Sequence, residues 1–238
     1  MGIEVAAPAR PVRIDLKDIA WRLGVGLGAG VLVGYLVAGP LARLLMFVLR
    51  LTSPDAVRGV TSDDGFTIGV FSTDTLFLVT VCGGLGGVAG IAYASFRAAI
   101  QRLRARLVLW TALCTLLVGG GLVRTDGVDF VLLEPTALAV AGFVALPGIT
   151  GLLIALLVER WSRVTPSRNW VTAGILAPGA LSPPAVLVAI LVGLGWLAFA
   201  RLPGSLPAQF ARVAVPTAAV AAIVLSMVDL ARDIEVLF

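Results

Sequence analysis

Few side chains in this sequence could do chemistry, and most of these are acidic residues in two short polar stretches. Asp63-Asp64-Gly65 and Asp126-Gly127-Val128-Asp129 could offer carboxylate oxygens to a divalent cation. Their spacing matches no EF-hand, and six arginines are expected on the same face of the molecule. Solvated loops with a few weak ion pairs are the simpler interpretation. Arg43 and Arg50, seven residues apart on one helix face, are then the expected partners of Asp126 and Asp129.

Missing residue types exclude several other sites. There is no histidine, which excludes His-ligated haem, zinc sites with a His ligand and His-based acid–base catalysis. Lys17 is the only lysine and lies in a polar N-terminal segment, so no Schiff base is expected within the apolar part. Cys82 and Cys114 lie in separate apolar segments without CxxC spacing and are interpreted as packing residues. We therefore expect a protein that is not an enzyme and binds no cofactor, metal or nucleic acid.

The elements that position these residues must lie in a membrane. Hydrophobic residues make up 59% of the 238 residues and charged residues 13%, and a soluble domain of this size cannot bury so much apolar surface. The apolar stretch Val171–Pro184, interrupted by prolines, could lie at the interface, re-enter the membrane or begin the fifth helix. Six segments are long and apolar enough to cross a bilayer as helices: Ile19–Ala38, continuing to Leu49 with a kink at Pro40; Thr75–Phe96; Leu107–Val123; Thr136–Val158; Ala185–Ala200; and Val213–Leu230.

The distribution of basic residues predicts that both termini are cytoplasmic. In a six-helix arrangement twelve of the eighteen Lys and Arg residues fall on the side of the N-terminus, and such residues favour the cytoplasmic face. The expected fold is an all-α domain of six transmembrane helices over residues 19–234, after a cytoplasmic segment over residues 1–18. The Arg-rich, Lys-poor composition indicates a bacterial plasma membrane, with anionic lipids at the cytoplasmic face. Residues 235–238 resemble part of a protease site used to remove tags and receive no functional weight.

A long extracytoplasmic loop over residues 50–74 separates the first two helices. Within it, Val57–Ser72 combines an Asp-Asp-Gly turn signal with flanking strand-forming residues, which predicts a small β-hairpin. An isolated hairpin is marginally stable in water, so one face is expected to pack on the bundle or on a partner. The residues expected to dock are Phe66 and Ile68 on one side of a strand and Asp63 and Asp64 at the tip.

Glycine forms the strongest pattern inside the predicted membrane helices. GxxxG steps recur in the first and second helices, and small residues four apart let two helix backbones approach closely. Packing within one chain is the favoured interpretation, packing between subunits is the next, and a glycine-lined pore is the least favoured. The residues expected at close helix contacts are Gly24, Gly28, Gly30, Gly34, Gly83, Gly87 and Gly90.

Two functions are compatible with these features. The first is a non-enzymatic membrane component, such as a subunit, scaffold or assembly factor, that docks a membrane protein or a second copy of itself. The second is a small oligomeric transporter or channel for a neutral, apolar or lipid-like molecule, with a cavity near the proline breaks. The central parts of the predicted helices carry no ionisable residue, which favours the first function. A cavity that penetrates the bundle would favour the second.

Overall fold

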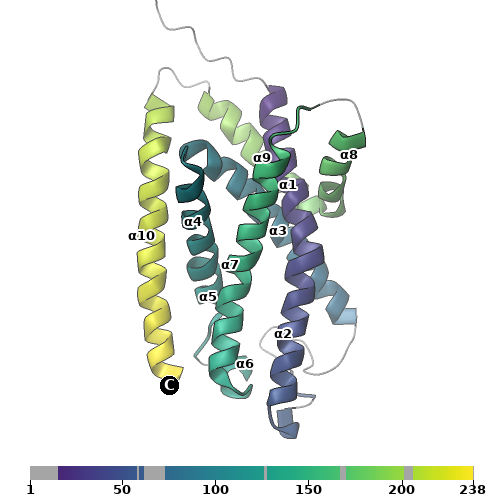
Figure 1. Cartoon of the computed structure of the whole chain (residues 1–238), viewed down its shortest axis with the longest axis vertical. Helices are drawn as coiled ribbons and strands as arrows, with labels where there is room; N and C mark the ends of the chain where they lie inside the picture. Colours follow the sequence, from purple (N-terminus) through teal and green to yellow (C-terminus); the bar gives the residue numbers. More distant parts are fainter. Residues whose placement is uncertain are drawn as a thin grey trace, which may run out of the picture.

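The computed structural model describes residues 16–57, 59–61, 73–125, 128–166, 170–200 and 206–237. Figure 1 shows a bundle in which the long helices lie side by side. The elements are α1 Leu16–Val33, η1 Gly34–Ala38, α2 Gly39–Thr52, η2 Asp55–Val57, α3 Thr73–Ala99, α4 Leu103–Leu113, η3 Cys114–Gly119, α5 Gly120–Leu122, α6 Val128–Val131, α7 Thr136–Trp161, α8 Trp170–Leu176, η4 Ala177–Leu181, α9 Pro183–Ala200 and α10 Leu206–Leu237.

Five helical stretches are long and apolar enough to cross a membrane. This finding confirms the broad prediction of a helical protein with several membrane-spanning helices. The five stretches are Leu16–Thr52, Thr73–Ala99, Leu103–Leu122, Thr136–Trp161 and Val213–Leu237.

The segment predicted as the fifth crossing is one arm of a sharply bent helix pair. The pair consists of α8–η4 and α9, which meet at an angle of 109° around Ser182. Gly28 of α1 lies against the carbonyl of Ile175 in α8, and Gly193 of α9 lies beside Leu23. Both arms therefore contact α1, and Figure 1 shows α8 starting and α9 ending at the same end of the bundle. The pair enters and leaves at that end, as a re-entrant loop does.

The bend follows from the sequence Ser182-Pro183-Pro184. Proline disfavours the helical conformation for the residue that precedes it, and Ser182 has φ −130° and ψ 83°. Proline also suits the first turn of a helix, where amide donors would lack partners. These two effects end η4 before Ser182 and start α9 at Pro183.

The bent pair leaves the predicted topology of six crossings with both termini on one side unsupported, because five stretches qualify as crossings, or six if the pair counts as one span. Figure 1 shows the C-terminal end of α10 at the end of the bundle opposite the start of α1. The packing of α10 agrees, because Ala219 belongs to the apolar cluster of Trp110. Further along, Leu230 lies beside Gly120. The Cβ of Leu230 is 3.7 Å from the position that a Cβ on Gly120 would occupy. A bent pair that returns to its own end of the bundle adds no crossing, which agrees with the start of α1 and the end of α10 lying at opposite ends of the bundle.

The first long helix passes Pro40 within one stretch of 37 residues. Gly34–Ala38 forms a π-helical turn, and the amide of Gly39 donates to the carbonyl of Gly34. Proline lacks an amide donor and crowds the preceding turn, and the wider turn relieves this crowding. The irregularity expected at Pro40 therefore takes the form of a π turn just before it.

The predicted β-hairpin is not supported, since the ranges that the structure describes contain no β-strand. Val57, expected on its first strand, ends the short helix η2 and is buried in one cluster with Leu49 and Phe130. Burial of this side chain against helices outweighs its strand propensity. The remaining residues of the prediction, including Asp63, Asp64, Phe66 and Ile68, lie outside the described residues.

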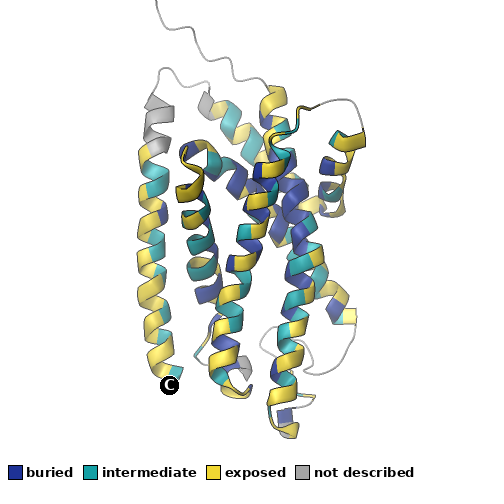
Figure 2. Ribbon diagram, in the orientation of Figure 1, coloured by how far each residue is buried: buried dark blue, intermediate teal, exposed yellow. Residues whose placement is uncertain are grey.

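Burial is uneven across the bundle. Figure 2 shows buried residues concentrated in the middle of α1 and in the helix segments that lie against it, whereas α10 is largely exposed. Only 6% of the apolar window of α10 is buried, compared with 33% for α3. Most of the described surface of α10 is therefore exposed, and the core is built mainly by α1, α3, α4 and α7.

Candidate functional site

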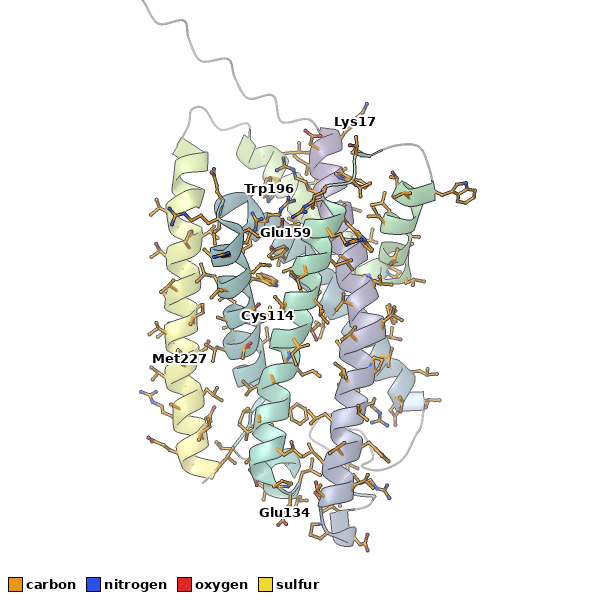
Figure 3. All side chains as sticks on the ribbon, viewed as in Figure 1. Lys17, Cys114, Glu134, Glu159, Trp196 and Met227 are labelled. Atoms are coloured by element: carbon orange, nitrogen blue, oxygen red, sulfur yellow. The ribbon has the colours of Figure 1, made fainter. Side chains whose placement is uncertain are left out.

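α3, α4 and α7 bring four polar side chains together near one end of the bundle. Oε1 of Glu159 lies 2.7 Å from Nη2 of Arg106 and 3.1 Å from Nε of Arg97. The hydroxyl of Tyr93 donates a hydrogen bond of 2.9 Å to the same oxygen. Tyr93 is fully buried, and Glu159 and Arg106 are each 8% exposed. We name these four residues the Glu159 cluster, and Figure 3 labels Glu159.

Arg106 also closes the turn between α3 and α4. Its Nη1 donates to the carbonyls of Ile100, at 3.0 Å, and Arg97, at 3.4 Å. These carbonyls belong to the C-terminal end of α3, where backbone acceptors lack helical partners and carry partial negative charge. One guanidinium therefore satisfies the end of α3 and connects it to the carboxylate on α7.

Aromatic rings pack beside the Glu159 cluster. The ring centroids of Tyr93 and Trp110 are 5.3 Å apart, and those of Phe96 and Trp110 are 5.5 Å apart. Nε1 of Trp110 donates a hydrogen bond of 3.2 Å to the carbonyl of Gly151, which joins α4 to α7. Within the described ranges, no group of three or more His, Cys, Asp or Glu side chains could hold a metal ion. The arrangement is suited to holding three helices together.

Sequence interpretation misses the Glu159 cluster. It ends the fourth membrane helix at Val158, whereas α7 continues to Trp161 and buries Glu159. It also treats Arg97 and Arg106 only as indicators of orientation. One signal was available, a lone carboxylate directly before Arg160 at the end of an apolar segment. Its partners could not be identified, because they lie more than fifty residues away in the sequence.

Four tryptophans mark the same end of the bundle. Figure 3 shows Trp196 and Lys17 at this end and Glu134 at the opposite end, and we name the two ends the tryptophan end and the Glu134 end. Tryptophan is enriched at membrane–water interfaces, where its ring contacts both lipid and headgroups. Glu159 lies two residues before Trp161, about 3 Å along the helix axis. The Glu159 cluster is therefore close to headgroup depth. The four residues are Trp21, Trp161, Trp170 and Trp196.

The bent pair carries irregular backbone far along the bundle from the tryptophan end. The hydroxyl of Tyr35 donates to the carbonyl of Leu181 at 3.2 Å, and the amide of Val186 donates to the carbonyl of Ser182 at 3.0 Å. Tyr35 lies fourteen residues beyond Trp21, about 21 Å along a helix, and the hydrocarbon layer is about 30 Å thick. Irregular backbone at such depth requires partners from protein or water. Here protein groups provide them.

A groove of about 330 Å³ lies between α3 and the bend. This volume is at the lower end of the range for ligand sites. Gly84 borders the groove. A Cβ at this position would make a van der Waals contact of 3.4 Å with Oγ of Ser182, so a side chain there would extend into the groove. The lining is uncharged and includes Tyr35, Thr80, Gly84, Leu181, Ser182 and Val188.

No family model matches this chain. Comparisons with curated proteins and with solved structures also find no match. The function has to be inferred from the contacts, burial and charge of the chain itself.

The glycines predicted at helix contacts lie at two packing surfaces. On the first, Gly30, Gly34 and Gly90 lie between α1 and α3, together with Gly26 and Gly86. A Cβ at Gly26 would lie 2.5 Å from the carbonyl oxygen of Gly90, and one at Gly34 would meet the backbone of α3. Such contacts leave no room for a larger residue and permit close backbone packing.

The second surface joins the bent pair to the bundle. Gly24 and Gly28 contact α8, and a Cβ at Gly24 would lie 2.7 Å from a methyl group of Leu176. Gly87 lies against the start of α9, and Gly83 lies against the tyrosine ring that reaches the bend. Small residues on α1 and α3 therefore provide the space that the re-entrant pair occupies.

Arg43 and Arg50, two of the residues predicted to form outer ion pairs, belong to the Glu134 end. Nη2 of Arg43 donates to Oγ1 of Thr75 at 2.8 Å, which links α2 to α3. Nε of Arg50 is buried and has no hydrogen-bond partner among the described residues. Asp126 lies outside the described residues, and Asp129 belongs to α6 with its side chain not described. The ion pairs to these two acids stay predictions.

The last turns of α2 expose a row of large apolar side chains. Their positions, at intervals of three and four residues, place them on one helix face. They are between 37% and 61% exposed. We name this face the α2 stripe, and it consists of Leu44, Phe47, Val48 and Leu51.

The α2 stripe lies farther along the first helix from Trp21 than the thickness of one hydrocarbon layer. Arg43, just before the stripe, is hydrogen-bonded to Thr75 in the first turn of α3, so the helix continues past the start of its neighbour. Leu51 lies thirty residues beyond Trp21, about 45 Å along the helix, which exceeds the hydrocarbon thickness of about 30 Å. Figure 1 shows the end of α2 reaching farthest from the tryptophan end.

Proposed function

We propose that this protein is a non-enzymatic component of a bacterial plasma membrane that docks a neighbouring membrane-protein subunit at its Glu134 end. The observation that carries the proposal is the α2 stripe, whose apolar side chains are exposed at a distance from Trp21 that exceeds the hydrocarbon thickness. Contiguous exposed apolar surface outside lipid is a feature of interaction sites, because water does not stabilise it. The partner supplies an apolar helix face or loop that covers the stripe.

The local structure supports a site that is rigid before the partner binds. The amide of Glu134 donates to Oγ of Ser53 at 2.8 Å, which connects the end of α2 to the segment before α7. Leu49 lies on the side of α2 opposite the stripe and is fully buried. The bundle therefore holds the helix by that side. A pre-organised surface loses less conformational entropy when a partner binds. The docking role predicted for Phe66 and Ile68 belongs to the same proposal, because they follow α2 in the chain.

The proposed orientation places the tryptophan end in the cytoplasm and the α2 stripe outside. With a re-entrant pair, thirteen of the eighteen Lys and Arg residues belong to segments on the tryptophan side, compared with twelve in the six-crossing arrangement. Cysteine labelling of intact cells tests this orientation in a background with Cys82 and Cys114 replaced by Ala. Ser205→Cys, between α9 and α10, should stay unlabelled by an impermeant reagent, and Val236→Cys should be labelled. The reverse pattern would overturn the orientation.

Docking is tested by polar substitutions that leave the fold intact. Phe47→Gln combined with Leu51→Gln should keep the thermal stability of the purified protein, because both side chains are exposed. The double variant should lose a cross-link that a photoreactive residue at position 48 forms to its partner in membranes. Val131→Gln, also exposed at the Glu134 end, is the matched control and should keep the cross-link. A cross-link to the same chain identifies the partner as a second copy, and an unchanged cross-link in the double variant contradicts the proposal.

A second function, transport of a neutral, apolar or lipid-like molecule, is favoured by the re-entrant pair and its groove. Transporters place substrate sites at discontinuous helices near the middle of the membrane. Gly84→Leu should fill the groove without a backbone clash, and Gly195→Leu is the control because nothing lies within 4 Å of its Cβ position. If only Gly84→Leu abolishes the uptake of a fluorescent apolar probe into proteoliposomes, the transport function replaces the docking function. Equal uptake by both variants removes the transport candidate.

A further inference from the structure

The turn between α3 and α4 contains more positive charge than the described residues neutralise. Among the described residues at the tryptophan end, the acidic side chains are Asp18 and Glu159. Four arginines lie between positions 97 and 106 alone, on either side of the turn. The described basic residues at this end are Lys17, Arg22, Arg97, Arg102, Arg104, Arg106, Arg160 and Arg163.

Glu159 neutralises only part of this charge. Its one carboxylate contacts two guanidiniums, so the Glu159 cluster retains a net positive charge. Arg106 is occupied by the carboxylate and by two carbonyls. Arg97 is different, because its side chain is 29% exposed and only its Nε contacts Glu159. Neither Nη group of Arg97 donates to a described residue, so both can serve a ligand from outside.

Two more arginines lie at the N-terminus of α4, where the helix dipole already places partial positive charge. Arg102 is the N-cap of α4 and makes no side-chain capping bond, and Arg104 lies in the first turn. Both are exposed. The N-terminus of a helix presents free amides and a partial positive charge, so cations there are unfavourable unless an anion is bound. The backbone and the arginines therefore favour the same kind of ligand.

The depth of the turn identifies the ligand. The Glu159 cluster lies within one helical turn of Trp161, at the level of lipid headgroups. We propose that Arg97, Arg102 and Arg104 bind the phosphate of an anionic phospholipid in the leaflet at the tryptophan end. Guanidinium groups bind phosphate oxygens through charge-assisted and often paired hydrogen bonds. The site is independent of the docking proposal, because it lies at the opposite end of the bundle.

The test uses the full chain in detergent, titrated with phosphatidylglycerol or with phosphatidylcholine of the same acyl chains. Lipid retention is read by native mass spectrometry and by the shift of the melting temperature. Phosphatidylglycerol should be retained in preference, and the Arg102→Gln/Arg104→Gln variant should bind it on the order of tenfold more weakly. The control is Arg160→Gln/Arg163→Gln, which removes the same charge at the same end from exposed positions. It should bind the lipid almost as the unmodified protein does.

Three results would overturn the proposal. Equal weakening in both double variants would show diffuse attraction to the whole basic face, without a site at the turn. Unchanged phosphatidylglycerol binding in Arg102→Gln/Arg104→Gln would exclude these residues. A melting shift reproduced by millimolar inorganic phosphate would identify a free anion as the ligand in place of a lipid. Preferential lipid binding lost only in Arg102→Gln/Arg104→Gln would support the site.

Discussion

The Glu159 cluster and the bend at Ser182 are two polar regions in one apolar bundle, and they are stabilised by different chemistry. In the cluster, one carboxylate meets two guanidiniums and a hydroxyl within 3.1 Å. At the bend, two prolines lack amide donors, and the carbonyl of Leu181 accepts from the neutral Tyr35 hydroxyl. The cluster lies near headgroup depth and the bend lies far deeper. Because the cost of a charge rises towards the centre of a bilayer, ion pairs suit the first position and neutral hydrogen bonds the second.

The comparison also shows how each region holds its helices. The Glu159 cluster joins α3, α4 and α7 through side chains that reach across the space between them. The bend is held by close backbone contact, where Gly28 meets Ile175 and Gly87 meets the start of α9. Polar side chains determine the packing near the headgroups, and the absence of side chains determines it deeper in the membrane. Four predictions test this difference, from the largest expected effect to the smallest.

Glu159→Gln should cause the largest loss of stability. It leaves Arg97 and Arg106 without their carboxylate, and removing one partner of a buried ion pair costs about 3–5 kcal/mol. Thermal unfolding in detergent measures the effect, and Glu134→Gln, an exposed acid at the other end, is the control. Equal melting temperatures for the two variants would show that the cluster does not hold the helices.

The same change at two tyrosines compares the regions directly. Tyr93→Phe removes a hydrogen bond to a carboxylate and should cost about 1.5–3 kcal/mol. Tyr35→Phe removes an exposed hydrogen bond between neutral groups and should cost about 0.6 kcal/mol. Chemical denaturation of both variants measures the difference. A larger effect at Tyr35 than at Tyr93 would reverse the order that depth predicts.

Gly30→Leu tests whether backbone proximity holds the deep region. The added side chain would meet the backbone of Gly86 and Gly87, and overpacking of a tight interface costs about 1–3 kcal/mol. Gly121→Leu is the control, because nothing lies within 4 Å of its Cβ position. Melting temperatures that fall equally in both variants would indicate a general effect of leucine in these helices.

Arg232→Gln should have the smallest effect. Its guanidinium lies 3.9 Å from Asp229, and both side chains are more than 70% exposed. Exposed ion pairs contribute about 0–1 kcal/mol, so the melting temperature should barely change. A loss comparable with that of Glu159→Gln would show that burial does not distinguish the two ion pairs.

Sequence reasoning located most of the helices and missed the polar contacts between them. Long apolar runs predict membrane helices because each helix satisfies its own backbone in lipid, whatever its neighbours are. The local signal at Glu159, a lone carboxylate at the end of an apolar segment, could not identify its partners, since Tyr93, Arg97 and Arg106 come from other helices. The strand prediction at Val57 was wrong for a related reason, because burial with Leu49 and Phe130 outweighed its local propensity.

The sequence by itself determined the class of the protein and the position of its principal break. Composition requires a membrane, and Ser182-Pro183-Pro184 requires an interruption, because both effects act within a few residues. Only the tertiary structure decided whether the chain after that break crosses the bilayer or returns. A crossing segment and a returning segment are equally apolar. Which of the two forms depends on whether α1 and α3 offer a surface with room for the bent pair. Gly24, Gly28 and Gly87 provide that surface. Their contacts with the bent pair exist only once the helices have packed.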